Sequence, residues 1–157
     1  MAEAKPAVLR ALDVEARNTT IYPPSYAAAL KGREKRALGD HFGLTQFGVN
    51  LTTLAPGTWS SQRHWHEQED EFIYVVDGTI TLIDDAGEHT LTPGMCAGFK
   101  AGVANGHHLV NKSDRPATYL EIGTRSNHER SHYPDADMKG AKIDGKWVLT
   151  RKDGRAY

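Results

Sequence analysis

The sequence contains a single cysteine, Cys96, among its 157 residues. One thiol cannot form a disulfide within the chain, and there is no cysteine pair that could make a zinc ribbon or a redox motif. A lone thiol is also consistent with a reducing compartment, so we expect a cytoplasmic protein.

An excess of charge of one sign is also lacking. The 19 Lys and Arg residues nearly balance the 20 Asp and Glu residues, which gives a formal net charge of −1. The basic residues are scattered among acids and form no electrostatic footprint for nucleic acid or an anionic membrane, so we expect neither as a partner.

Long hydrophobic runs are missing as well. The longest apolar run, Phe72–Val76, is far shorter than the ~20 residues that a membrane-spanning helix needs. The N-terminal segment Met1–Pro6 carries an acid and a proline and leads into no apolar core of signal-peptide length. We therefore expect a soluble protein without a secretion signal.

Short runs of β-type residues, separated by turn signals, fill the chain from residue 44 onward and predict an all-β sandwich or barrel. The Asp77-Gly78 pair is a two-residue hairpin signal, so the strands on either side of it are predicted to pair directly. The predicted strands cover Leu44–Leu54, Phe72–Val76, Thr79–Ile83, His89–Thr92, Met95–Phe99, His107–Asn111 and Ala117–Ile122, with a possible late strand at Trp147–Leu149.

The chain length predicts one domain, 1–157, with a core of about residues 44–123 between two arms, 1–43 and 124–157. In the first arm, Pro24–Gly32 is the best helix candidate, with Ser25 as its N-cap. The arms also contain apolar residues with no obvious place inside so small a barrel, namely Ile21, Tyr22, Trp147 and Val148. We therefore expect a homodimer in which the arms pack on a neighbouring barrel.

The His64-Trp65-His66 segment, followed by Glu71, reads as half of a metal site. Residues two apart in a strand point to the same side, so both imidazoles can reach one ion, and the carboxylate can return to it if the chain bends. Imidazole and carboxylate together suit zinc, iron, nickel, copper or manganese. A third histidine is available downstream at His107 or His108.

Two motifs carry a family resemblance. The first, Gly57-(six residues)-His64-x-His66-(four)-Glu71-(six)-Gly78, resembles the first cupin motif, and the second, Gly94-(five)-Lys100-Ala101-Gly102-(four)-His107-(three)-Asn111, resembles the second cupin motif. The resemblance covers about residues 44 to 123. It implies a cupin double-stranded β-helix, or jelly-roll barrel, that binds one divalent metal ion inside. Lys100 stands where the second motif usually has proline, which restores backbone freedom and an N–H there.

Carried over by position, the metal ligands are His64, His66, Glu71 and His107, and Asn111 is the usual partner four residues beyond the last ligand. We prefer His107 to His108, because strand alternation then turns His107 inward and His108 outward. Glu69 and Asp70 are alternatives to Glu71 as the carboxylate ligand, or else form a solvated acidic loop. The ion is expected to be zinc, iron, manganese or nickel.

Further residues are candidates for the surroundings of the metal. Gln62 shares the face of the two histidines if the strand begins that early, which makes it a candidate for contact with the ligands or a substrate. Tyr74 and Phe99 could line a pocket or simply pack in the core.

Three neutral imidazoles and one carboxylate give a divalent centre a net charge of about +1 and leave two positions open in six-coordinate geometry. Such an ion can polarise a carbonyl, activate water or bind dioxygen. We expect a metal-dependent enzyme for a small polar or sugar-like molecule, of the isomerase, lyase or dioxygenase type. The alternative is a non-catalytic small-ligand-binding cupin with a structural metal. An acid or base beside the metal and an open pocket would favour the enzyme, whereas a sealed hydrophobic barrel would favour the alternative.

Overall fold

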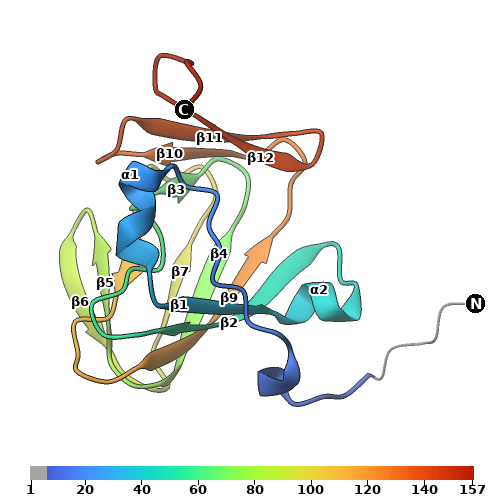
Figure 1. Cartoon of the computed structure of the whole chain (residues 1–157), viewed down its shortest axis with the longest axis vertical. Helices are drawn as coiled ribbons and strands as arrows, with labels where there is room; N and C mark the ends of the chain where they lie inside the picture. The colour runs from blue at the N-terminus through green and yellow to red at the C-terminus, as the bar shows by residue number, and fades with distance from the viewer. Residues whose placement is uncertain (1–6) are drawn as a thin grey trace, which may run out of the picture.

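Antiparallel strands dominate the molecule, which confirms the predicted all-β fold class (Figure 1). The computed structural model describes residues 7–157, so the segment Met1–Pro6, which we predicted not to be a secretion signal, lies outside the described residues. Within that described range, no helix is long and apolar enough to cross a membrane.

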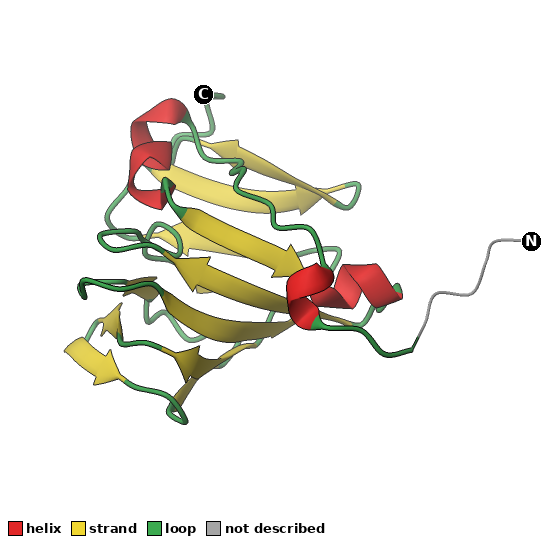
Figure 2. Cartoon of the chain, turned by 60° about the horizontal axis from the view of Figure 1, so that its bottom comes forward, coloured by secondary structure: helices red, strands yellow, loops and turns green. Residues whose placement is uncertain are grey.

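The strands form three sheets, with the orders β1-β2-β9-β4-β7, β12-β11-β10-β3 and β6-β5-β8. Figure 2 shows the strands stacked in layers, with the few helical turns at the periphery. The strands are β1 (Arg33–Ala37), β2 (Phe47–Leu54), β3 (Trp65–His66), β4 (Glu71–Asp77), β5 (Ile80–Asp84), β6 (Gly87–Leu91), β7 (Cys96–Phe99), β8 (His108–Val110), β9 (Ala117–Thr124), β10 (Arg130–Tyr133), β11 (Met138–Ile143) and β12 (Lys146–Thr150).

Each strand predicted from the sequence is present, including the late strand β12, although the bounds shift by up to three residues. The predicted pairing across the Asp77-Gly78 turn, however, is wrong. Strand β4 pairs with β7 and β9, whereas β5 pairs with β6 and β8. Both edges of β4 are therefore already occupied, and the turn carries the chain from one sheet to another. Gly78 has a φ of +77°, and a Cβ there would lie 2.7 Å from the Pro116 carbonyl oxygen.

The predicted helix Pro24–Gly32 is shorter than expected. An α-helix, α1, covers Pro24–Ala27, and a 3-10 turn, η2, follows at Ala28–Leu30. Ser25 lies inside α1 and is not its N-cap, because Pro23 holds the N-cap position with extended backbone angles. The sequence did not predict the short 3-10 turn η1 (Ala11–Asp13) or the helix α2 (Leu38–Phe42).

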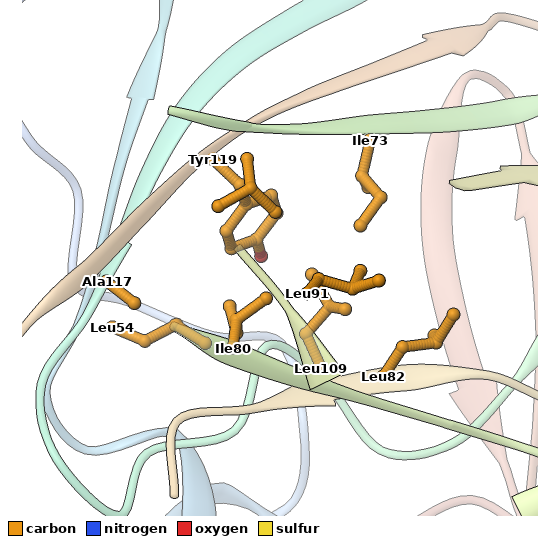
Figure 3. Packing of buried hydrophobic residues seen from close by; sticks show 9 residues of the cluster. Leu54, Ile73, Ile80, Leu82, Leu91, Leu109, Ala117 and Tyr119 are labelled. Atoms are coloured by element: carbon orange, nitrogen blue, oxygen red, sulfur yellow. The ribbon is translucent and has the colours of Figure 1, made fainter. Parts of the chain in front are cut away.

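The main core lies between the five-stranded and the three-stranded sheets. In Figure 3, Ile73 from β4 and Tyr119 from β9 point toward Leu91 and Leu109 on the opposite side. Burying each such side chain contributes about 1.5–3 kcal/mol. The rest of the buried cluster comprises Leu54, Val75, Ile80, Leu82 and Ala117, with Ala97 and Phe99 packed against it.

The C-terminal arm folds back over its own barrel and forms β10, β11 and β12 (Figure 1). The barrel contributes β3 to this sheet, because Ser131 pairs with His66 and His132 with Trp65. A second apolar cluster underlies this sheet and contains Tyr133, Ala136 and Met138, against which Tyr22, Tyr26 and Leu149 pack.

Two of the arm residues predicted to need a neighbouring barrel find their place in the same chain. Tyr22 packs edge-to-face on Tyr133, with ring centroids 5.8 Å apart. Trp147 lines a cavity of the same chain. The prediction is wrong for these two because the C-terminal sheet creates a second apolar layer within the protomer. Ile21 and Val148 stay exposed. The homodimer itself remains a prediction, which a mass measurement by light scattering would test.

Candidate metal centre

Two histidines face each other at β3: His66 is its last residue, and His64 directly precedes the strand. The Nε2 atoms of His64 and His66 lie 3.0 Å apart, and their rings are nearly perpendicular, at 88°. His64 is fixed to His107 by a pair of backbone hydrogen bonds, in which His64 N donates to His107 O at 3.1 Å and His107 N donates to His64 O at 2.8 Å. This bridge brings the histidine of the second motif next to the two histidines of the first.

Glu71, the first residue of β4, supplies the carboxylate of this cluster. Its Oε2 lies 2.8 Å from His107 Nε2, 3.9 Å from His64 Nε2 and 3.8 Å from His66 Nε2. The two alternative acids do not join these four residues: Asp70 accepts a hydrogen bond from Ala101 N, and Glu69 accepts one from Ser126 N, although a Glu69 ligand atom lies within 4.8 Å of one of His66 in a separate group with Glu129. The structure therefore brings together His64, His66, Glu71 and His107, the set that the motifs indicate.

The outer nitrogens of two of these histidines face backbone carbonyls. His64 Nδ1 lies 2.9 Å from Gln62 O, and His107 Nδ1 lies 3.4 Å from Asn105 O. A carbonyl can only accept, so the tautomer with hydrogen on Nδ1 satisfies it and directs the Nε2 lone pair into the cluster. A divalent metal ion would accept these lone pairs. Without an ion, His107 Nε2–H can instead donate to Glu71, and His66 Nε2–H to His64 Nε2.

Burial disfavours the protonated form of His64. Desolvation, reinforced by the neighbouring His66, lowers the pKa of His64 to about 3. Burial would raise the pKa of Glu71, but the hydrogen bond and charge of His107 outweigh it and hold this pKa at about 2. Burial would also lower the pKa of His66, but the carboxylates of Glu129 and Glu71 raise it above its ordinary value. The inner face of the cluster therefore combines neutral imidazole at His64 with an ionised carboxylate.

The donor set fits a divalent metal ion. Zinc lies about 2.0–2.2 Å from imidazole nitrogen and carboxylate oxygen, which puts neighbouring ligand atoms roughly 3 Å apart. The 2.8 Å and 3.0 Å contacts of this cluster have that separation. Candidate ligand atoms of His64, His66 and Glu71 all lie within 4.8 Å of one another. These residues could hold one ion. The candidate ligands named here are imidazoles and a carboxylate, with no softer thiolate among them.

The other predicted site residues take different places. Phe99 stacks on the His107 ring, with centroids 3.5 Å apart, and lines the cavity beside the cluster. Gln62 donates to the Tyr26 carbonyl and so ties α1 to the barrel. Tyr74 is exposed on the outer face of β4. Asn111 is fully buried and donates to the carbonyls of Leu54 and Arg115, which makes it a brace for a turn.

His108, the alternative third histidine, directs its side chain to Ser61 and Trp59. Its Nδ1 lies 3.1 Å from Ser61 O, and its ring packs edge-to-face on Trp59. We predicted that it points outward, but it is only 5% exposed. The reason is that the segment Trp59–Ser61 runs alongside β8 and covers it, with Ser60 N donating to Leu109 O.

The sequence reasoning missed Glu129, a fully buried acid whose Oε1 lies 3.5 Å from His66 Nδ1. No local pattern marks this residue, which directly precedes β10. Only the pairing of β10 with β3 brings it to the cluster.

A cavity of about 480 Å³ lies beside the cluster and opens to solvent. Its walls come from four parts of the chain: the N-terminal segment Thr19–Tyr22, the five-stranded sheet, the segment Ser60–Ser61 with His108 and Leu109 of β8, and the C-terminal sheet with Lys142 and Trp147. The charged side chains of the lining beyond the cluster are Arg33, Lys35, Glu69, Asp70, Glu121, Arg125 and Lys142. The site is therefore neither sealed nor hydrophobic.

Comparison with known proteins agrees with the observed fold. The family model described as the cupin domain matches residues 50–123. A sugar phosphate isomerase from a cupin superfamily, from Silicibacter pomeroyi, superposes with a TM-score of 0.89 at 48% sequence identity, over 93% of this chain and 94% of that chain. This chain belongs to the cupin superfamily. No curated protein matches this cupin.

More distant structures share the same fold. A protein from Acidithiobacillus ferrooxidans, provisionally named a sugar phosphate isomerase, has a TM-score of 0.72 and 29% identity over 80% of each chain. The polyketide cyclase of Streptomyces resistomycificus has a TM-score of 0.62 and 21% identity, over 76% of this cupin and 80% of that chain. At that identity, the likeness to the cyclase concerns the fold alone.

Proposed function

We propose that this cupin is a metal-dependent enzyme of the isomerase type that acts on a small, polar, anionic substrate. The observation that carries the proposal is a carboxylate and an amine beside the ligand cluster, in a cavity that opens to solvent. Glu69 has a candidate ligand atom within 4.8 Å of one of His66. Its carboxylate is ion-paired with Lys142, and both side chains are mostly buried. The name of the relative from Silicibacter pomeroyi supports the same reaction class.

Isomerisation of a hydroxy-carbonyl compound moves a proton between neighbouring carbons, so it needs an acid or base near the reacting atoms. Glu69 is the group that would accept and return this proton, because its carboxylate lines the cavity beside the cluster. Lys142 balances the negative charge of Glu69 in this mostly buried position. A bound divalent ion would act as a Lewis acid on a carbonyl oxygen of the substrate.

An uncompensated positive charge in the lining of the cavity, that of Arg33, supports an anionic substrate. The Arg33 guanidinium donates to the carbonyls of Ser60, at 2.6 Å, and Thr19, at 3.1 Å. It forms no ion pair with any acid in residues 7–157, unlike Lys35, which pairs with Glu121 at 3.0 Å. Arginine has five N–H donors, so three remain for an anionic group.

Deuterium uptake tests the proposal. The protein is loaded separately with Zn²⁺, Fe²⁺, Mn²⁺ or Ni²⁺ and incubated in D₂O with aldose and ketose phosphates, and the compounds are analysed by mass spectrometry. We expect uptake of deuterium with at least one ion, and its loss in Glu69→Gln while the metal content stays that of the wild type.

The alternative is a cupin that binds a small ligand without transforming it. In that case the same compounds would raise the unfolding temperature of the loaded protein, but no deuterium uptake or product would follow. If the compounds neither bind nor exchange, the proposed substrate class is wrong.

A further inference from the structure

Glu129 is a carboxylate outside the ligand set that is nevertheless fully buried beside one of the ligands. It also lies outside residues 50–123, the part of the chain that the cupin family model covers. Burying an ionised carboxylate is costly unless hydrogen bonds and an opposite charge compensate it. The surroundings of Glu129 should therefore indicate what this charge is for.

Two backbone amides hold the carboxylate in place. Glu67 N donates to Oε1 at 2.9 Å, and Gln68 N donates to Oε2 at 3.0 Å. Both amides belong to the loop that follows His66, so Glu129 is fixed relative to this ligand. Among residues 7–157, His66 is the one basic side chain within 4.0 Å of the carboxylate, with Nδ1 at 3.5 Å from Oε1.

His66 Nδ1 lacks the backbone carbonyl partner that Nδ1 of the other two candidate ligand histidines has. It is buried and has no hydrogen-bond partner among the described residues. His64 and His107, in contrast, point their Nδ1 atoms at the neutral carbonyls of Gln62 and Asn105. An orphaned donor and a buried acceptor thus face each other across 3.5 Å, a gap that a small rotation of the imidazole would close to hydrogen-bonding distance.

We propose that Glu129 is a positioning residue for the metal site, which accepts a hydrogen bond from His66 Nδ1 when a divalent ion occupies Nε2. The inference rests on the metal site of the proposed function. The carboxylate would fix the tautomer and the ring orientation of His66 and strengthen it as a ligand. It would also connect the C-terminal sheet to the ion, because Glu129 leads directly into β10.

Zinc titration of the metal-free protein tests this role. Loss of such a partner typically costs 10–100-fold in metal affinity, and we expect a loss of that size in Glu129→Gln. Asn111→Ala is the matched control, because it also removes a fully buried polar side chain but does not touch the ligand cluster. We expect it to lower the unfolding temperature and to leave zinc affinity unchanged.

The outcomes separate the two proposals. If wild type binds zinc and Glu129→Gln binds it equally tightly, the positioning role is refuted and the metal site stands. If wild type does not bind zinc, both proposals fail. If Glu129→Gln and Asn111→Ala lose zinc affinity to the same extent, Glu129 has only a structural role.

Hydrogen exchange of the wild type gives a second test that does not depend on the folding of any variant. Zinc should slow exchange of the Glu67 and Gln68 amides, and of β10, by a larger factor than in the remote β5–β6 hairpin. The proposal would be overturned if zinc slowed exchange by equal factors in β10 and in the β5–β6 hairpin, and by a larger factor only at the paired amides of His64 and His107.

Discussion

Replacing Gly78 by alanine should destabilise the protein more than the same change at Gly57, although both glycines have nearly the same backbone conformation. The φ angles are +77° at Gly78 and +78° at Gly57. A side chain in this left-handed region costs about 1–2 kcal/mol, and both variants bear this cost. Alanine also reduces the entropy of the unfolded chain to a similar degree at both positions.

The difference lies in the space around the added methyl group. At Gly57 nothing lies within 4 Å, whereas at Gly78 the Cβ would lie 2.7 Å from the Pro116 carbonyl oxygen and 2.8 Å from the Ala117 Cα. Both are backbone atoms, and relieving such overlap costs about 1–3 kcal/mol. We therefore expect losses of roughly 1–2 kcal/mol for Gly57→Ala and roughly 2–5 kcal/mol for Gly78→Ala.

Urea denaturation of the two metal-free variants and the wild type, at one pH, measures these free energies of unfolding. Equal losses would refute the reasoning, because they would mean that the backbone around Gly78 moves away from the added methyl group without a cost in free energy. A larger loss at Gly57 would refute it as well.

Three further predictions concern the site. His66→Ala should lose bound metal while the barrel stays folded, whereas His108→Ala should retain the metal; elemental analysis and thermal unfolding of both variants decide this, and the reverse pattern would contradict the ligand assignment. Burial lowers the pKa of His64 to about 3, so below about pH 6.5 the unfolded state binds more protons than the folded state. The stability of the metal-free protein should therefore fall as the pH is lowered from about 6.5 to about 3. Denaturant midpoints across that range measure this stability, and a flat profile would contradict the prediction. Arg33→Gln should raise KM for a phosphorylated substrate more than it lowers kcat, and an unchanged KM would remove Arg33 from substrate binding.

The proximity of His64, His66 and Glu71 could be predicted because its signals are local. His64 and His66 are two residues apart on an extended segment, and Glu71 opens the next strand, so the period of the strand and one bend define their relation. The preference for His107 over His108 follows from the same alternation, although the burial of His108 does not, since it depends on a covering segment from a different part of the chain.

The features that could not be predicted from the sequence depend on pairing between strands far apart in the chain. Asp77-Gly78 has the backbone signature of a tight turn, but whether such a turn makes a hairpin depends on β7 and β9, which occupy both edges of β4. Glu129 reaches His66 only through the pairing of β10 with β3. Strand β1 was missed because Arg33–Arg36 is entirely charged, and the cavity that receives two of these side chains, Arg33 and Lys35, becomes apparent only in the folded barrel.

The origin of the cavity walls has a consequence for how this protein can change. The candidate ligands stand on the barrel and the loops next to it, whereas Lys142 and Trp147 reach the cavity from β11 and the adjoining strand. An exchange of the segment after Tyr133 for that of another cupin would retain Glu129 and every candidate ligand. Such an exchange would also replace the strand that pairs with β10 and the Lys142 N–H that donates to Glu129 O. Under the proposed function, new substrates would therefore be reached by changing side chains of β11 and β12 that face the cavity, with the backbone pairing of these strands kept.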